Sequence, residues 1–206
     1  MTAINTGTGV LPDYRGRKLV DKIYAHAIPL LKKEGITKCA LEVIQENERA
    51  IKVYQRIGFE KIRNVNCYGG QIINKNTPIP DSLKVVKTSH PHWELYPDCF
   101  DFVPPWNNAL AYIQRIPEDY TVLELFDNHQ FVGFGATTTT GSMPTFGIHP
   151  KFRGKGYGRI LLENLAKISP KLRINNVEAT SVNTIQLLEK MGMKNSINQY
   201  EMLLTI

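Results

Sequence analysis

Apolar residues recur at helical spacing in two stretches of the chain, and each stretch follows a short apolar segment and a glycine-containing turn. The first series ends near Gly35 and the second near Pro170, two residue types that stop helices. The members are Leu19, Val20, Ile23, Tyr24, Ala27 and Leu31 in the first series, and Ile160, Leu161, Leu165 and Ile168 in the second. This periodicity predicts two amphipathic helices.

Each of these helices is followed by the same predicted succession of a strand, a second helix and a last strand. The strands are Cys39–Ile44 and Ile174–Ala179, the second helices Glu48–Ile57 and Val182–Met191, and the last strands Glu60–Cys67 and Gln199–Ile206. Both second helices end on a glycine and an apolar residue, Gly58-Phe59 and Gly192-Met193, with the glycine as helix C-cap. The second series also has elements in front of it: a short helix around 107–115 and strands Tyr120–Phe126, Gln130–Thr139 and Thr145–Ile148.

Residues 8–17 and 146–155 align without a gap, which predicts a duplication. Six features coincide: Gly9 with Gly147, Val10 with Ile148, Pro12 with Pro150, Tyr14 with Phe152, and both members of Arg15-Gly16 with Arg153-Gly154. The period is close to the length of a domain, so the repeat indicates duplicated domains rather than a solenoid.

The second copy continues into a glycine-rich turn, Arg153-Gly154-Lys155-Gly156-Tyr157-Gly158. Glycines let the backbone approach a ligand closely and adopt positive φ. Free N–H groups at the start of the following helix favour an anion, and Arg153, Lys155 and Arg159 can add charge-assisted contacts to phosphate. A structural turn with incidental glycines is the alternative interpretation.

Composition and charge narrow the setting. The 206 residues are 42% hydrophobic and 21% charged, which is typical of a globular protein. Three cysteines without CxxC spacing indicate neither a disulfide framework nor a zinc site. We therefore expect a reducing cytoplasm as the location, and we expect no bound metal. The net charge of +6 lies within residues 1–75, which hold 13 Lys and Arg against 7 Asp and Glu. Either an anionic partner or a solvated helix face explains this excess.

The order of these elements around an R-x-x-G-x-G loop resembles the GNAT superfamily of acyl-CoA-dependent N-acetyltransferases. The loop at 153–158 carries that motif in full, and Asn47–Phe59 resembles the closing N-x-x-A-x-x-x-Y-x-x-x-G-F signature. The resemblance implies an α/β fold with a mostly antiparallel central sheet flanked by helices. We expect a partial GNAT-like unit at 1–75, a linker at 76–84 that contains Pro78 and Pro80, and a complete domain at 85–206.

The resemblance also implies acetyl-CoA as cofactor, held by the second unit. Its pyrophosphate would lie on the amides of the loop, and its pantetheine arm would lie along the preceding strand, where a backbone N–H polarises the thioester carbonyl. The residues expected to bind it are Phe146, Gly147, Ile148, Arg153, Gly154, Lys155, Gly156, Tyr157, Gly158, Arg159 and Asn183. Asn183 either contacts the cofactor or caps its helix.

Three residues are candidates for proton transfer. Tyr54 occupies the place of the family tyrosine that protonates the departing thiolate, and ordinary core packing is its alternative role. Glu124, on a predicted strand, and His149, directly after the cofactor strand, are candidates for general base or proton relay. The aligned position of Tyr54 in the second unit is Leu188. In the first loop, Lys18 and Val20 replace Gly156 and Gly158, and we expect Val20 to resist a positive φ there.

The expected function is direct transfer of an acetyl group from acetyl-CoA to a primary amine of a small molecule or peptide. A non-catalytic acyl-CoA-binding or regulatory module is the alternative. Nucleic-acid binding is disfavoured because aromatic and basic residues do not alternate, and no segment is apolar enough for a membrane span. A half-unit at 1–75 leaves an open sheet edge. We therefore expect docking on the second unit, a homodimer, or a start inside a longer tandem protein.

Overall fold

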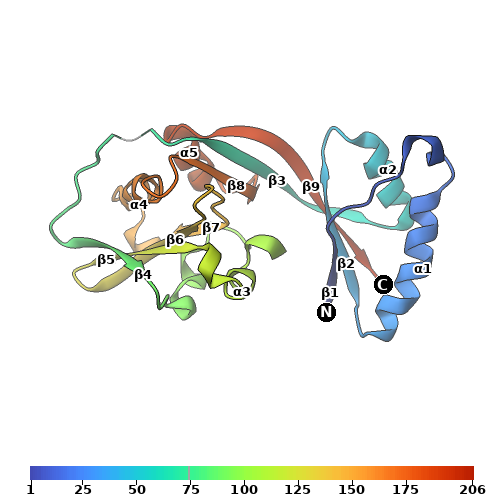
Figure 1. Cartoon of the computed structure of the whole chain (residues 1–206), viewed down its shortest axis with the longest axis horizontal. Helices are drawn as coiled ribbons and strands as arrows, with labels where there is room; N and C mark the ends of the chain where they lie inside the picture. Colours follow the sequence, from blue (N-terminus) through green and yellow to red (C-terminus); the bar gives the residue numbers. More distant parts are fainter. Residues whose placement is uncertain (74) are drawn as a thin grey trace. The chain divides into compact units, whose positions relative to one another are not determined.

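The computed structural model describes residues 1–73 and 75–206, which form two compact units (Figure 1). Unit 1 comprises Met1–Val65 together with Asn198–Ile206, and unit 2 comprises Asn66–Ile197. Both units combine helices with mostly antiparallel strands, which confirms the predicted mixed α/β fold class. None of the helices within the described residues has the length and apolar character needed to cross a membrane.

Unit 1 is a small sheet covered by two helices. Its elements are β1 (Thr2–Asn5), a 3-10 turn (Pro12–Tyr14), α1 (Leu19–Lys33), β2 (Lys38–Ile44), α2 (Glu48–Ile57) and parts of β3 (Glu60–Gln71) and β9 (Lys194–Thr205). Strand β1 pairs in parallel with β2, and β2 pairs antiparallel with β9. Alternate residues of β2 (Cys39, Leu41 and Val43) pack with Tyr24 of α1 and Tyr54 of α2, so one face of the sheet carries the core.

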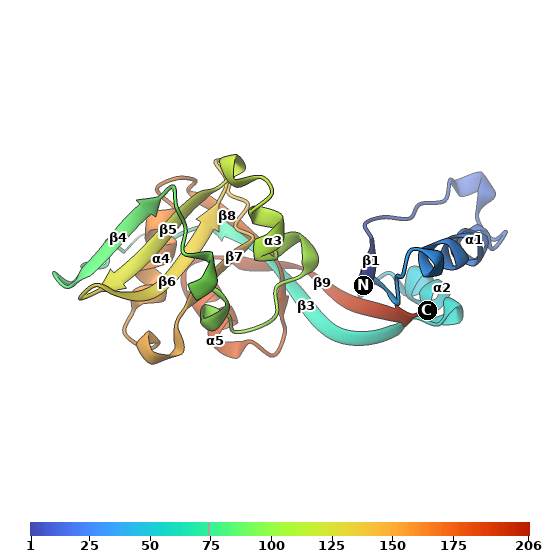
Figure 2. The same cartoon turned by 90° about the horizontal axis from the view of Figure 1, so that it is seen from below.

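Unit 2 is built around a four-stranded antiparallel sheet in the order β4-β5-β6-β7. These strands are β4 (Leu83–Thr88), β5 (Thr121–Asp127), β6 (Gln130–Thr137) and β7 (Thr145–Ile148). The other elements are α3 (Leu110–Ile113), α4 (Tyr157–Leu165), β8 (Lys171–Glu178) and α5 (Val182–Lys190). Strand β8 pairs within the second sheet, whose order is β1-β2-β9-β3-β8, so β7 and β8 are edges of different sheets. Figure 2 shows β4 to β7 side by side, with the segment before β5 on one face.

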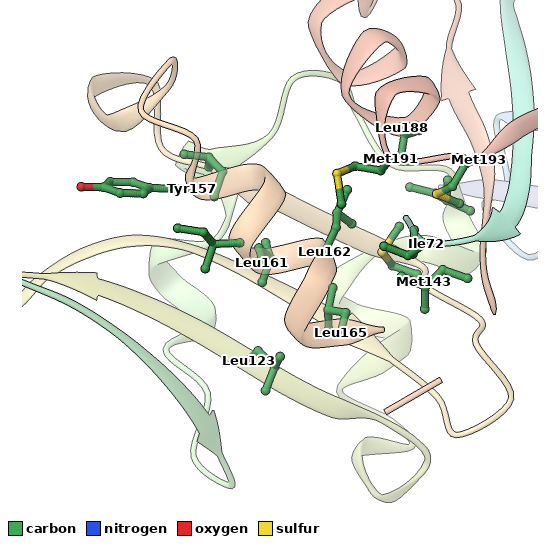
Figure 3. Close-up of a cluster of buried hydrophobic side chains, with 14 of the residues drawn as sticks. Ile72, Leu123, Met143, Tyr157, Leu161, Leu162, Leu165, Leu188, Met191 and Met193 are labelled. Carbon is green, nitrogen blue, oxygen red and sulfur yellow. The ribbon is translucent and has the colours of Figure 1, made fainter. Parts of the chain in front are cut away.

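Helix α4 contributes five buried residues to the core of unit 2: Tyr157, Ile160, Leu161, Leu162 and Leu165. Leu161 and Leu165 pack toward the sheet, where an added β-carbon on Gly135 would lie 2.8 Å from Leu165 Cδ1 and 3.4 Å from Leu161 Cδ1. Leu162 turns instead toward Leu188 and Met191 (Figure 3). All three leucines of α4 are fully buried. Because its first turn follows the glycine loop directly, this packing fixes the loop against the sheet.

The second helix of each repeat agrees closely with the prediction, but the helix expected around 107–115 is limited to Leu110–Ile113, and Ile168 lies beyond the end of α4. Helix α2 spans the predicted residues, and α5 ends one residue earlier than predicted. Strand β4 was not predicted, and its first residue, Leu83, lies within the segment expected to be a linker. In the first repeat the strand is Thr2–Asn5, and residues 6–11, although 8–10 align with the end of β7, are not in a strand. Residues 6–11 include Gly7 and Gly9, which weaken a strand because they offer no side chain to pack.

Strands β3 and β9 are longer than predicted, at 12 residues each, and each contributes residues to both units. The sequence assigned the last strand of each repeat to its own unit. In the structure, Asn198–Ile206 groups with unit 1 through the β2–β9 pairing. Hydrophobic periodicity specifies that a segment is a strand, but not which neighbour it pairs with. The family-domain boundaries at 1–75 and 85–206 stay a prediction.

Candidate functional site

A cavity of about 450 Å³ lies in unit 2 between β7 and β8, which are edge strands of two different sheets. Strand β7 supplies one wall, and Ile174 of β8 with Asn183, Thr184 and Leu187 of α5 supplies another. The glycine loop and the segment from Cys99 to Pro104 complete it. Ten of the eleven residues predicted to bind a cofactor line this cavity: Phe146, Gly147, Ile148, Arg153, Gly154, Gly156, Tyr157, Gly158, Arg159 and Asn183. Lys155 is exposed and does not line it.

The loop has the backbone conformation that its glycines suggested. Gly154 and Gly156 have φ values of 80° and 85°, in the left-handed region where residues with a β-carbon are strained. A β-carbon added to either would meet no atom within 4 Å, so the space beside them is open. Gly156 is also the residue before the first turn of α4, whose N–H groups lack partners within the helix. This arrangement suits an anion.

The loop in unit 1 has nearly the same backbone geometry. Gly16 has a φ of 79°, and Lys18, at the position of Gly156, has a φ of 53°. Val20 and its counterpart Gly158 both lie inside helices and neither has positive φ, so the expected resistance of Val20 to a positive φ is not tested by this loop. Gly158 lies close to α5: a β-carbon there would lie 2.8 Å from Leu187 Cδ2, and the end of the Leu187 side chain would have to shift.

Strand β7 presents backbone groups along its edge next to the cavity. The His149 N–H donates to the carbonyl oxygen of Val132 at 2.8 Å, toward β6. Because successive N–H groups of a strand point to opposite edges, those of Phe146 and Ile148 point away from β6. Strand β7 is the last strand of its sheet in the described part of the chain, so these groups have no strand partner there. They are available to a ligand in the cavity.

The Arg153 side chain holds three groups that surround the cavity. Its Nε donates to the Ile148 carbonyl at 2.8 Å and one Nη to the Cys99 carbonyl at 3.2 Å. The other Nη forms an ion pair with Asp101. Asp101 also accepts a hydrogen bond of 2.5 Å from the Thr184 hydroxyl of α5. The Arg153 charge, which was predicted to contact phosphate, is therefore paired with the Asp101 carboxylate.

The segment after β3 is fixed to α4 by Glu163, which is 5% exposed. The Glu163 carboxylate accepts hydrogen bonds from the Lys75 N–H at 3.2 Å and from the Thr77 N–H and hydroxyl at 3.0 and 2.8 Å. Burial alone would raise the pKa of Glu163, but the bonds from Thr77 and Lys75 and the nearby charge of Arg159 outweigh burial and lower this pKa. Thr77 is thereby held at the rim of the cavity.

Glu163→Gln is expected to destabilise the fold at neutral pH and to have no effect in acid. The folded-state pKa of Glu163 is lowered, so its stabilisation is present above the unfolded pKa of about 4.3 and is lost as the pH falls through the lower folded value. Three hydrogen bonds to a charged group predict a difference of about 2 kcal/mol at pH 7. Urea midpoints at pH 7 and about pH 3 measure it. Glu189→Gln, an exposed change of the same charge, is the control, and an equal loss from both variants would contradict this role.

Glu124 and His149 lie outside the lining of the cavity. Glu124 is 1% exposed and accepts hydrogen bonds from the Tyr96 hydroxyl at 2.5 Å and from the His92 backbone N–H at 2.9 Å, and its other carboxylate oxygen lies 3.0 Å from His92 Nδ1. Burial, and then the bond to Glu124, raise the pKa of Tyr96. His149 caps the 3-10 turn Pro150–Phe152 by accepting from the Lys151 N–H. Their roles as base or relay stay predictions.

Tyr54 lies in unit 1, where it lines a second groove of about 660 Å³ beside Lys18 and Arg49. Its ring packs edge-on against Tyr24 and Phe59, with centroids 6.3 and 5.7 Å away. No hydrogen bond of its hydroxyl is found among the described residues. At the aligned place in unit 2, Leu188 is fully buried in the core. Of the two units, the first has the tyrosine and the second has the three glycines.

Among the lining residues that were not predicted from the sequence are Thr77, Cys99, Asp101 and Thr184. They come from a linker, an irregular segment and a helix interior, and none belongs to a motif. Burial raises the pKa of the Cys99 thiol to about 12, so it is protonated and unreactive at neutral pH. One sequence feature could have indicated this covering segment: Gly147 has no side chain, which allows Cys99 to lie close to β7.

The structure is therefore that of an α/β protein with a cleft between the edge strands β7 and β8 of two sheets, beside a glycine loop and a helix start. A model of the acetyltransferase (GNAT) family matches residues 3–59 and 87–193, which is most of the chain. The chain belongs to the GNAT family, as the sequence resemblance indicated. A comparison with curated protein sequences found no match.

Solved structures show the same fold at low sequence identity. A GCN5-related N-acetyltransferase from Sphaerobacter thermophilus has a TM-score of 0.70 at 14% identity, over 95% of this chain and 70% of that one. Another from Kribbella flavida has a TM-score of 0.69 at 11% identity, over 98% and 80%. A tandem GNAT protein from the clavulanic acid biosynthesis pathway has a TM-score of 0.71 at 14% identity, over 99% and 75%.

Proposed function

We propose that the protein is an acetyl-CoA-dependent N-acetyltransferase that acetylates a primary amine, with the cofactor held in unit 2. The observation that carries this proposal is the cavity between β7 and β8, which ends at the glycine loop and at the start of α4. Family membership supports acetyl transfer as the general chemistry. The identity of the cofactor, its site and the amine are the parts that we propose.

The residues present fit the phosphate end of acetyl-CoA. Gly154 and Gly156 leave open space where side chains would otherwise stand, and the first N–H groups of α4 and the Arg159 side chain both favour an anion. Arg159 lines the cavity, and Lys155 is exposed beside it. Asn183, which lines the opposite wall at the start of α5, is the polar side chain that we assign to the cofactor there.

Strand β7 and the apolar side chains of the cavity would act on the thioester end of acetyl-CoA. Acetyl-CoA, when bound, supplies an acetyl group activated as a thioester. The N–H groups of Phe146 and Ile148 point away from β6 and can donate to the carbonyl oxygen as negative charge develops on it. Side chains such as Phe146, Phe152 and Leu187 exclude water from this wall, which strengthens those hydrogen bonds.

The amine must lose a proton and the departing thiolate must gain one. We assign the first role to a carboxylate or a water chain, with Glu124 and His149 as candidates. The residue predicted for the second role, Tyr54, does not line the cleft of unit 2. Glu124 is 1% exposed beneath His92 and Tyr96, so it requires a relay through one of them. Tyr54 belongs to unit 1, where no described residue bonds its hydroxyl.

A non-catalytic acyl-CoA-binding module is the second candidate, and Leu188 favours it. This buried leucine stands where the aligned unit carries Tyr54, so the cofactor cleft lacks its own thiolate acid. Such a module would bind acetyl-CoA without turnover.

Calorimetry with acetyl-CoA, followed by a thiol-release assay over a panel of primary amines, separates the two candidates. Binding with amine-dependent release of coenzyme A supports the transferase. Binding without release for any amine supports the module. Absence of binding would refute both.

A further inference from the structure

Three walls of the cleft in unit 2 meet at the Arg153 side chain. The Ile148 carbonyl is at the end of β7, the Cys99 carbonyl belongs to the covering segment, and Asp101 reaches α5 through Thr184. Each contact uses a different N–H of the guanidinium group, which has five in a rigid planar fork. The Arg153 side chain is 34% exposed and that of Asp101 is 23% exposed, so the pair is partly shielded from water.

This pairing changes what Arg153 can contribute to an anion. The Arg153 and Asp101 charges cancel at short range, so the pair exerts little net attraction on phosphate. Arg159, which lines the same cleft, has no ion pair within the described residues and keeps its charge. The attraction for phosphate therefore comes from Arg159 and from the loop amides.

We propose that Arg153 is a positioning residue that fixes the width of the cleft and does not bind the cofactor phosphates. It does so by fastening the segment 99–101 and, through Asp101, the first turn of α5 to the end of β7. The proposal rests on the proposed function for the identity of the ligand, but the clamp itself is a property of the free protein.

Unit 1 supplies an internal comparison. Arg15 Nε donates to the Val10 carbonyl at 3.1 Å, the counterpart of the Arg153 bond to Ile148. Within the described residues Arg15 forms no ion pair. The bond from the arginine to the carbonyl five residues before it is thus common to both loops, and the connection to Asp101 and Thr184 is special to unit 2.

The clamp is tested first without ligand, by hydrogen exchange of the full chain. The double variant Arg153→Gln/Asp101→Asn keeps the summed charge of the pair at zero, and it should speed amide exchange in residues 99–104 and 182–187. Thr184→Val should speed exchange in 182–187 alone, and Thr184→Ser, which keeps the hydroxyl, should restore the native rate. Arg15→Gln should leave both segments unchanged. Unchanged exchange in the double variant would refute the clamp, whatever binding shows.

The second measurement is the salt dependence of coenzyme A binding, because contact between a charge and phosphate is weakened by ionic screening. The double variant should bind roughly tenfold more weakly, as expected for losing hydrogen bonds to charged groups, with the native dependence on salt. Arg159→Gln should flatten that dependence and leave exchange unchanged. A flattened dependence in the double variant would show that Arg153 binds phosphate and would overturn its assignment. If the native protein binds no coenzyme A, the proposed function fails, and the exchange data alone decide the clamp.

Discussion

Replacing Gly156 with valine is expected to abolish coenzyme A binding, with the dissociation constant raised at least about 100-fold. Gly156 has a φ of 85°, where a β-branched residue is strongly disfavoured. Relief of that strain would turn the peptide plane and misdirect the N–H groups that precede α4. The valine side chain would also enter the open space beside the loop. Calorimetry with coenzyme A measures the loss, and unfolding curves show whether the fold is retained.

Lys18 provides the matched control, because it holds the same position in the loop of unit 1. It has a φ of 53°, so that loop already tolerates a side chain in the left-handed region. Lys18→Ala should leave coenzyme A affinity within about twofold of native, as for a surface change away from the site. Equal losses from Gly156→Val and Lys18→Ala would show that the functional loop has been assigned to the wrong unit.

The cofactor wall could be predicted from sequence because it is local. The glycines at 154, 156 and 158, the strand before them and the helix after them are contiguous, so spacing alone specifies their arrangement. Nine of the ten residues predicted between 146 and 159 meet in one cavity as a result. Lys155 is the exception, since its side chain lies by the Phe152 ring, 5.2 Å from the centroid. Asn183, on the opposite wall, was predicted from the family resemblance and not from contiguity.

The opposite wall could not be predicted, because it is assembled from distant segments. Asp101 and Thr184 are 83 residues apart, and the bond between them depends on how an irregular segment crosses the end of β7. No periodicity marks such a segment. The pairing of β9 with β2 could not be predicted for a similar reason. Alternation of apolar residues identifies a strand, but tertiary packing determines which strand it pairs with.

Gly147→Ala is expected to destabilise unit 2 by about 2–3 kcal/mol, at the upper end for an added methyl group in a packed interior. A β-carbon on Gly147 would lie 2.5 Å from the Cys99 carbonyl oxygen and 2.8 Å from Cys99 Cβ. The nearest atom belongs to the backbone and cannot turn aside as the end of a side chain can. The segment must move, and Arg153, which donates to that carbonyl, then loses its partner.

Gly9 is the matched control, because it aligns with Gly147 in the first repeat. A β-carbon on Gly9 would meet no atom within 4 Å, and Gly9 does not have positive φ. Gly9→Ala should therefore change stability by less than about 0.5 kcal/mol. Urea unfolding followed by circular dichroism compares the two variants. The loss in free energy of unfolding should be several-fold larger for Gly147→Ala than for Gly9→Ala, because of the two glycines only Gly147 is covered by another segment. Equal losses would mean that Cys99 does not pack tightly against β7.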